Sequence, residues 1–595
     1  MKTLLASAAA VSLLCLSAPA LAGAAPYTSA YGDYLVGRMA AAGGDTQTAG
    51  RALMAAADAD PENATLRERA FLAAMMNGDM GFALSHLPQT GGRLSQALSL
   101  QAQAVSAVRQ NRSGDIKRVL AASEKAAGSD RTLQLLRPLL FAADGQWNAA
   151  IDADLVKALG TDATIRRDKL VTFLQAVNQA QLLERKGRNS EAEEIYALIC
   201  QPGPSRVLFG PYFGAFLERR GRKDEARALY TEILSASEDR LVRRRLAALD
   251  APGYRKPAKP EIRLIMAESL FLSGTLYASE QQAEMALTSL RLAQFAAPEK
   301  PEAQGITDRA RLLAGQVLIR LRDIPAAQQE WASVEPSSPF YTEAQTRAAW
   351  AYKESADLDA AYEIFTALGA ASPQDAGLVV ERARILWQKD DTAGGLKLLD
   401  DYVAAYGDKT FDWQTWFSYA VLQQAAGDWE KTKVSAKRGL ELQPESPELL
   451  NLLGYGMIDR GENVDDGMEM IRKALKSAPR SGAIMDSLGW GYYKQGKYAE
   501  ALEWVEKAIA LEPADPEITE HLGDVYLKLG RGVEAKYQWA RVLTLEADDT
   551  QKASVQAKLD AAAKADQARD AKAVADAAIA PPVVPAKKAP TKTRK

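Results

Sequence analysis

Two consecutive segments near the C-terminus, starting at Gly482 and Pro516, place the same residue types 34 positions apart. The matched pairs are Leu488 with Leu522, Gly489 with Gly523, Tyr492 with Tyr526, Gly496 with Gly530, Ala501 with Ala535 and Ala508 with Val542. Less regular copies start at Trp413 and Pro447. A fixed period of this length predicts stacked supersecondary units instead of a single central core.

Each unit contains two apolar stripes at i, i+3, i+4 and i+7, which predict two amphipathic helices of about a dozen residues. A glycine near the middle, such as Gly496, permits a turn with positive φ between them. Small residues such as Gly489 and Ala501 let the two helices approach closely. A closing proline, such as Pro513, ends the second helix because it lacks the N–H donor. The repeating unit is therefore expected to be a helical hairpin.

This pattern resembles the tetratricopeptide repeat (TPR) family, which places Leu-Gly and Tyr in the first helix, Ala in the second and Pro at the end. The match is strong over residues 413–547, clear over 173–240, 267–298 and 342–373, and fainter over 30–61 and 64–97. The resemblance implies an all-α fold, a TPR solenoid of about a dozen helical hairpins. It also implies a non-enzymatic role in binding other proteins.

Changes in composition divide the chain further. We expect TPR-like repeats at 23–250 and 261–412, well-matched repeats at 413–547, and a proline-rich linker, APGYRKPAKP, at 251–260. The linker separates an N-terminal from a C-terminal array, and whether the two form one superhelix stays open. An Ala/Lys/Asp-rich segment at 548–580 predicts one exposed, weakly held helix, and 581–595 predicts a disordered basic tail.

The first 22 residues have the pattern of a cleaved secretory signal peptide. Lys2 precedes an apolar run over 4–16, and Ala20-Leu21-Ala22 supplies small residues for cleavage before Gly23. No other stretch approaches the roughly 20 apolar residues of a membrane span. We therefore expect an exported protein, periplasmic or peripherally associated with the cell envelope.

Composition narrows the possible chemistry. The chain has 73 basic and 76 acidic residues, only two His and two Cys, and a pI near 5.9. These values disfavour a nucleic-acid binder, a His/Cys zinc site and a disulfide framework. The sequence also lacks the G-x-x-x-x-G-K-[ST] phosphate loop. We expect no cofactor and no metal. Cleavage of the signal peptide removes Cys15, and we expect the remaining Cys200 to be buried.

One enzyme class combines a signal peptide with an α-superhelix, the lytic transglycosylases. The chain offers Glu268-Ser269 but lacks the Gly-Leu-Met-Gln stretch that follows in that class. A hydrolase is therefore the least favoured alternative. His86 is expected to be structural or capping, and His521 with its neighbouring carboxylates is expected to be a surface charge cluster.

The TPR resemblance implies groove positions in the first helix of each unit. These positions hold Asn451, Tyr455 and Asp459, then Asp486, Trp490, Tyr493 and Lys494, then Glu520, Asp524, Leu527 and Lys528. Aromatic anchors mixed with charges suit capture of a peptide or protein segment. The alternative, that Trp490 and Tyr455 only pack against adjacent helices, stays open.

The acidic groove positions narrow the expected partner. TPR proteins that bind chaperone tails hold a C-terminal carboxylate with Lys, Asn and Arg, whereas Asp486 and Trp490 stand at corresponding places here. A neutral or basic segment is therefore favoured. The sequence predicts a periplasmic scaffold for assembly or export of cell-envelope components. The main alternative is a peripheral anchor on an anionic cell-wall or membrane surface through the tail residues Lys587, Lys588, Lys592, Arg594 and Lys595.

Overall fold

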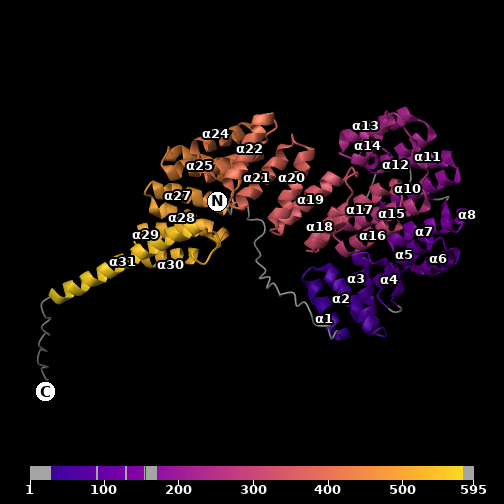
Figure 1. Ribbon diagram of the computed structural model, residues 1–595, viewed down its shortest axis with the longest axis horizontal. Coiled ribbons are helices and arrows are strands. Elements are labelled where there is room, and N and C mark those ends of the chain that lie inside the picture. The colour runs from indigo at the N-terminus through magenta and orange to yellow at the C-terminus, as the bar shows by residue number, and fades with distance from the viewer. Residues whose placement is uncertain (1–28, 89–90, 127–129, 153–154, 156–169, 580–595) are drawn as a thin grey trace, which may run out of the picture. The chain divides into compact units, whose positions relative to one another are not determined.

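The computed structural model describes residues 29–88, 91–126, 130–152, 155 and 170–579 (Figure 1). Its regular structure is helical throughout these residues, without a strand, which confirms the all-α prediction. The signal peptide predicted at 1–22 and the tail at 581–595 lie outside the described residues. None of the described helices combines the length and apolarity that a bilayer crossing requires.

The chain forms two compact units. Along the sequence, the boundary between them lies between Leu368 and Gly369, inside α20 (Leu358–Ala371). The helices of the N-terminal unit are α1 (Ala30–Ala42), α2 (Thr46–Ala59), α3 (Ala64–Asn77), α4 (Met80–Ser85), α5 (Arg93–Arg109), α6 (Ser113–Ala126), α7 (Arg131–Ala143), α8 (Trp147–Ala150), α10 (Leu170–Lys186), α11 (Asn189–Ile199), α12 (Pro204–Arg220), α13 (Lys223–Ala236), α14 (Arg240–Leu249), α15 (Ile262–Ser279), α16 (Ala283–Ala296), α17 (Pro301–Arg320), α18 (Ile324–Ala332) and α19 (Tyr341–Glu354).

The N-terminal unit is more than a chain of neighbouring hairpins. Besides packing on its neighbours in sequence, α16 contacts α3 and α5, and α15 contacts α5, α7 and α10. Thr132 and Ser273 hydroxyls lie 2.7 Å apart across this junction, and Arg131 pairs with Glu280 at 2.9 Å. One apolar cluster, running from Phe71 to Ala351, joins early and late helices. The early repeats therefore fold back against the later ones.

The segment 251–260 has no helix, but it does not separate two compact bodies. Helix α15, which follows it, packs against α7 and α10, which precede it. Leu272 of α15 also lies against the apolar cluster that runs from Leu135 of α7 to Leu249 of α14. The segment is therefore a non-helical connection inside one compact unit, and the boundary between the two units lies within α20.

The C-terminal unit is a regular array of hairpins. Its helices are α21 (Ala376–Gln388), α22 (Thr392–Tyr406), α23 (Trp413–Ala425), α24 (Trp429–Leu442), α25 (Pro447–Arg460), α26 (Val464–Ser477), α27 (Gly482–Lys494), α28 (Tyr498–Leu511), α29 (Pro516–Lys528), α30 (Gly532–Val542) and α31 (Asp549–Ile579).

The predicted hairpins appear where the 34-residue period placed them. Helices α27 and α29 begin at Gly482 and Pro516, and the turns at Gly496 and Gly530 have φ of 76° and 78°. The first helices α21, α23, α25, α27 and α29 pack on one another, whereas within residues 376–547 successive second helices make slight contact at most. The first helices therefore form the inner layer of the array.

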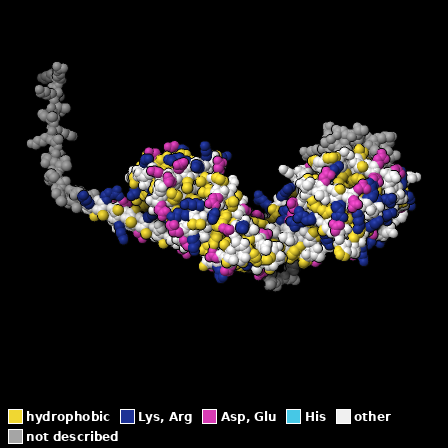
Figure 2. Space-filling model, turned by 90° about the horizontal axis from the view of Figure 1, so that it is seen from above, with side chains coloured by type: hydrophobic (Ala, Val, Ile, Leu, Met, Phe, Trp, Pro, Cys, Tyr) yellow, Lys and Arg dark blue, Asp and Glu magenta, His cyan; other side chains and the backbone are white. Residues whose placement is uncertain are grey.

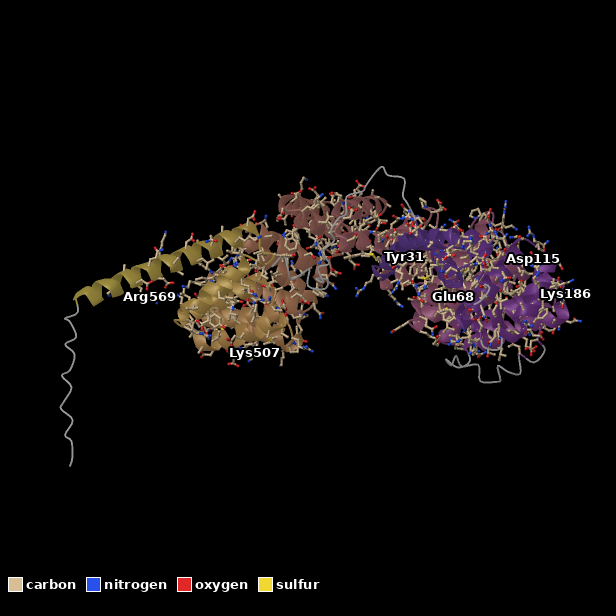
Figure 3. The ribbon with its side chains drawn as sticks, turned by 90° about the horizontal axis from the view of Figure 1, so that it is seen from below. Tyr31, Glu68, Asp115, Lys186, Lys507 and Arg569 are labelled. Carbon is tan, nitrogen blue, oxygen red and sulfur yellow. The ribbon has the colours of Figure 1, made fainter. Side chains whose placement is uncertain are left out.

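Helix α31 closes the end of the array. The fully buried Val555 packs in the same apolar cluster as Trp539 of α30, with Leu559 partly buried beside them. Further along, Asp566 pairs with Lys536, and the exposed Arg569 projects from the part of the helix that leaves the array (Figure 3). The expectation of an exposed, weakly held helix is thus wrong for its first half, because apolar residues at 555 and 559 share one face.

On the face shown in Figure 2, basic and acidic side chains are interspersed over both units. This agrees with the nearly equal numbers of basic and acidic residues in the chain. Neither sign of charge covers a whole unit in this view.

Candidate functional site

A cavity of about 420 Å³ opens on the inner layer of the C-terminal array. Residues of α23, α25, α27 and α29 line it, together with residues of the turns that precede α27 and α29. Its apolar wall consists of Phe417, Val421, Leu452, Ile484 and Ile518. Its size falls within the roughly 300–1,000 Å³ that is typical of ligand pockets.

The polar part of the lining is acidic. Four carboxyl groups line the cavity, those of Glu448, Asp486, Asp515 and Glu517, and no Lys or Arg is among the described residues that do so. The hydroxyl of Tyr455 donates to Glu517 at 2.7 Å. Burial, with the charge of Glu517 beside it, raises the pKa of Tyr455 well above its ordinary value, so this phenol is a permanent donor at neutral pH.

Asp486, which lines the cavity, forms a buried pair with His521, which lies beneath it. Nδ1 of His521 lies 2.7 Å from Oδ2 of Asp486, and both side chains are less than a tenth exposed. Burial alone lowers the pKa of His521, but the charge and hydrogen bond of Asp486, with Glu517 and Asp524 nearby, raise it to about 9. Burial also raises the pKa of Asp486, against the effect of His521. We infer an imidazolium paired with a carboxylate at neutral pH.

His521 is therefore not part of a surface charge cluster, which corrects the expectation from sequence. Its ring stacks on Trp490, with centroids 4.0 Å apart, and lies 6.4 Å from the ring of Tyr455. His521 is buried because the position before Leu522-Gly523 faces α27, where Asp486 and Trp490 lie. A single sequence does not show which neighbouring helix covers a polar residue.

Comparison with known proteins supports the repeat assignment. The family model described as "TPR repeat" matches residues 491–530, from the end of α27 to the end of the turn after α29. TPR repeat-containing protein PA4667 of Pseudomonas aeruginosa is 26% identical over 195 residues, 33% of this chain and 32% of that protein. Residues 491–530 therefore match a tetratricopeptide repeat. The matched segment spans about a third of this relative.

Solved structures of TPR proteins resemble this chain more loosely. A tetratricopeptide repeat protein from Parabacteroides merdae has a TM-score of 0.36 and 13% identity, covering 43% of this chain and 98% of its own. PilW, described as a widely conserved type IV pilus biogenesis factor, has a TM-score of 0.28 and 19% identity, covering 32% of this chain and 88% of its own. Likeness at this level carries no argument about function.

Three of the predicted groove residues line the cavity: Asn451, Tyr455 and Asp486. Asp459, Trp490, Tyr493 and Lys494 form a separate network beside it. The indole N–H of Trp490 donates to Asp459 at 3.2 Å, its ring stacks on Tyr493 at 4.5 Å, and Lys494 Nζ donates to the Asp459 carbonyl at 2.9 Å. Trp490 is only 9% exposed, so its ring is mainly a packing element.

The remaining predicted positions lie at the end of the array. Lys558 of α31 donates to Glu520 at 2.7 Å and to Asp524 at 2.6 Å, and Gln551 also donates to Glu520. Lys528 and Leu527 are exposed. Helix α31 thus occupies the inner face where a further repeat would continue the groove, and Glu520 and Asp524 hold it there.

Sequence reasoning missed several lining residues. Phe417, Val421 and Ile518 follow the general helical pattern and carry no separate signal, and Glu448 is missing from the predicted groove positions. A signal for the carboxylates does exist in the sequence, because Pro447-Glu448 and Pro516-Glu517 occupy the same place at the start of a first helix. Equivalent positions in stacked hairpins project from the same layer, so both carboxylates reach one cavity.

Glu268 and Ser269, weighed as a hydrolase pair, are placed in the N-terminal unit. Ser269 is buried and donates to the Ile265 carbonyl at 2.8 Å and to Asn178 Oδ1 at 2.9 Å. Glu268 lies 3.8 Å from Arg309. Both side chains thus serve helix packing. Cys200 is buried, as predicted, and burial raises its thiol pKa to about 11, while His86 caps the end of α4 through its contact with the Phe82 carbonyl.

Proposed function

We propose that this protein is an exported scaffold that binds a peptide or protein segment in the cavity of its C-terminal TPR array. The observation that carries the proposal is the cavity itself, an apolar wall with an acidic rim on the inner layer of first helices. A cavity of this kind buries apolar side chains of a guest while polar groups fix its orientation. TPR repeats are suited to protein–protein interaction, and a scaffold role follows from that property.

The cellular role is also a proposal. The predicted signal peptide favours export, so we propose that the partner belongs to the cell envelope and that the complex serves assembly or export of an envelope component. Cell fractionation with N-terminal sequencing tests the first part. The expected result is a chain in the periplasmic or envelope fraction that starts at Gly23, and a cytoplasmic chain with residues 1–22 intact would contradict it.

Photocrosslinking in intact cells tests binding in the cavity. A photoreactive residue in place of Ala483, a partly exposed lining residue, is expected to crosslink to a partner segment that mass spectrometry identifies. The matched control is the same residue in place of Glu469, which is exposed on the second helix α26. Absence of any crosslink from position 483, or equal crosslinking from both positions, would reject the proposed function.

A further inference from the structure

A second concave surface lies in the N-terminal unit, whereas the cavity described above belongs to the C-terminal unit. It is a shallow groove of about 360 Å³ between α14 and the connection from α18 to α19. Among the described residues, no Asp or Glu lines it. Its lining consists of Arg240, Arg243, Arg244 and Ala247 on one side and Ser337 and Pro339 on the other.

Helical spacing places the basic residues of the groove on one face of α14. The four lining positions of this helix follow one another at i, i+3, i+4 and i+7. On the other side, Val242 and Leu249 are buried, and Leu246 packs against the same apolar cluster. Because the apolar side holds α14 against the unit, its arginine face is fixed toward the groove.

Two of the three arginines are weakly paired. Arg244 is exposed and forms no hydrogen bond or ion pair with a described residue. Arg243 pairs with Glu238 at 2.7 Å, but these side chains are 61% and 91% exposed. An ion pair this exposed contributes little stability, because water and salt screen it. Arg243 can therefore exchange Glu238 for a carboxylate of a ligand.

The third arginine, Arg240, connects the two walls of the groove. Its guanidinium donates to the Pro339 carbonyl at 3.3 Å and lies 3.7 Å from Glu343, which also pairs with Arg347. Asp239, the preceding residue, caps the N-terminus of α14 with its carboxylate. Both acidic side chains thus stay outside the lining of the groove, and the charge of Arg240 adds to that of the other two arginines.

The donor geometry selects the class of ligand. A guanidinium presents a planar fork of N–H donors that matches a carboxylate or a phosphate. Residues three or four positions apart on a helix stand about 5–6 Å apart, so the arginines reach several anionic groups along one chain. A peptide segment with two or more Asp or Glu residues offers such groups, and a groove between two walls accommodates an extended chain.

Two other occupants are disfavoured. The tail at 581–595 has five basic and no acidic side chains, so its charge has the wrong sign. A helix that binds an anionic bilayer also inserts large apolar side chains. None of the exposed large apolar side chains among the described residues belongs to α14. An acidic segment of a partner protein is therefore the occupant that charge and surface composition favour.

We propose that this groove is a second docking site, which binds an acidic segment of a partner protein, and that Arg243 and Arg244 donate to the carboxylates of that segment. The inference goes beyond the proposed function, because it neither uses the cavity of the C-terminal unit nor depends on what binds there.

Peptide selection with a charge-matched control tests the proposal. Random dodecapeptides displayed on phage are selected on the full chain after depletion on the Arg243→Gln/Arg244→Gln double variant. The recovered peptides are expected to carry two or more Asp or Glu residues. Synthetic copies with Asn or Gln at those positions are expected to bind about 10- to 100-fold more weakly. The control variant, Arg93→Gln/Arg118→Gln, removes two exposed arginines of α5 and α6 and is expected to bind like wild type.

The neutral copies test the role of charge on the wild-type chain alone, so the test does not depend on the folding of the double variant. Recovery of no acidic peptide, or equal binding of the acidic and neutral copies, would overturn the proposal. Vesicles of phosphatidylglycerol and phosphatidylcholine test the competing occupant. Binding of wild type to these vesicles, lost in the double variant and without binding of any selected peptide, would assign the groove to a membrane surface and reject the proposal.

Crosslinking in intact cells separates this inference from the proposed function. A photoreactive residue in place of Ala247, which is exposed and lines the groove, is expected to capture an acidic segment of a partner. Ala248, which is exposed but outside the lining, is the matched control position. A crosslink from position 483 with none from 247 would leave the proposed function standing and reject this inference. A crosslink from 247 to an acidic segment, with none from 483, would do the opposite.

Discussion

At the scale of single residues, the buried pair of Asp486 and His521 connects stability to the site. The pair joins α27 to α29, and Trp490 stacks on the imidazole. A buried ion pair gains little over apolar packing, but removal of one partner leaves an uncompensated charge at a cost of several kcal/mol. The pair therefore fixes the orientation of Asp486, whose Oδ1 makes no hydrogen bond to any described residue.

The pH dependence of stability follows from His521. Its folded pKa of about 9 lies above the ordinary value of 6.5, so the folded state binds the proton more tightly than the unfolded state. This stabilisation, about 3 kcal/mol, is fully present below pH 6.5 and is lost as pH rises through 9. Urea unfolding of the wild-type chain between pH 6 and 9.5 is expected to show it, and His521→Gln is expected to remove that dependence.

The chain has only two histidines, so the titration is directly observable. Heteronuclear NMR of the imidazole C–H groups gives one signal for each, and His86→Gln assigns them. An imidazole of residue 521 that titrates at or below pH 6.5 would contradict the predicted stabilisation. If the free energy of unfolding falls equally with rising pH in wild type and His521→Gln, the pH effect comes from other groups.

The sequence predicted part of the site and missed part of it, for reasons visible at single residues. Asn451, Tyr455 and Asp486 were found because a repeat position fixes which layer a residue belongs to. The sequence does not decide whether Trp490 faces the groove or packs against adjacent helices, because this depends on the rings that stack on its two faces. Tyr493 lies on the same helix, but His521 comes from the next hairpin, and repeat position alone does not specify that contact.

At the scale of elements, close approach between the two helices of a hairpin depends on small residues. A Cβ on Gly454 of α25 would lie 2.7 Å from the Gly467 carbonyl oxygen of α26, a backbone atom that cannot move aside. Gly454→Ala is therefore expected to force the helices apart and to lower the free energy of unfolding by about 1–3 kcal/mol. Chemical denaturation followed by far-UV circular dichroism measures this change.

Gly532→Ala is the matched control for that prediction. Gly532 begins α30, its φ lies outside the left-handed region, and a Cβ at this position would meet no neighbouring side chain or helix within 4 Å. The same chemical change is expected to leave stability unaltered or to raise it by up to about 1 kcal/mol. Equal destabilisation by both substitutions would show that backbone propensity, and not helix contact, decides the cost.

Helix α31 acts as a cap on the last hairpin. Val555 is fully buried against the cluster that contains Trp539, whereas Ala557, two residues later, is exposed. Val555→Asp buries an unpaired charge and is expected to cost roughly 3 kcal/mol or more, while Ala557→Asp is expected to cost little. Hydrogen exchange of α29 and α30 measures the effect. Unchanged protection in Val555→Asp would show that the last hairpin needs no cap.

At the scale of the whole molecule, the sequence predicted the two units unequally. In the C-terminal unit each hairpin contacts mainly its neighbours, so a 34-residue period contains most of the information about packing. In the N-terminal unit α3, α5 and α7 contact α15 and α16, which follow them by more than a hundred residues. Such long-range contacts leave no period in the sequence, so the composition of the proline-rich segment between them does not show whether the two arrays form one compact unit.

Cleavage at two places tests this organisation. The apolar clusters of the C-terminal unit lie entirely within residues 376–562, so a fragment of residues 372–595 is expected to fold cooperatively and to keep its helical circular dichroism. A protease site placed in 255–258 is expected to give two pieces that stay together in size-exclusion chromatography, because α15 packs on α7 and α10 across the cut. The apolar surface that α15 shares with α7 and α10 should hold the two pieces together. If the pieces separate without denaturant, a boundary between two independent units lies at the linker.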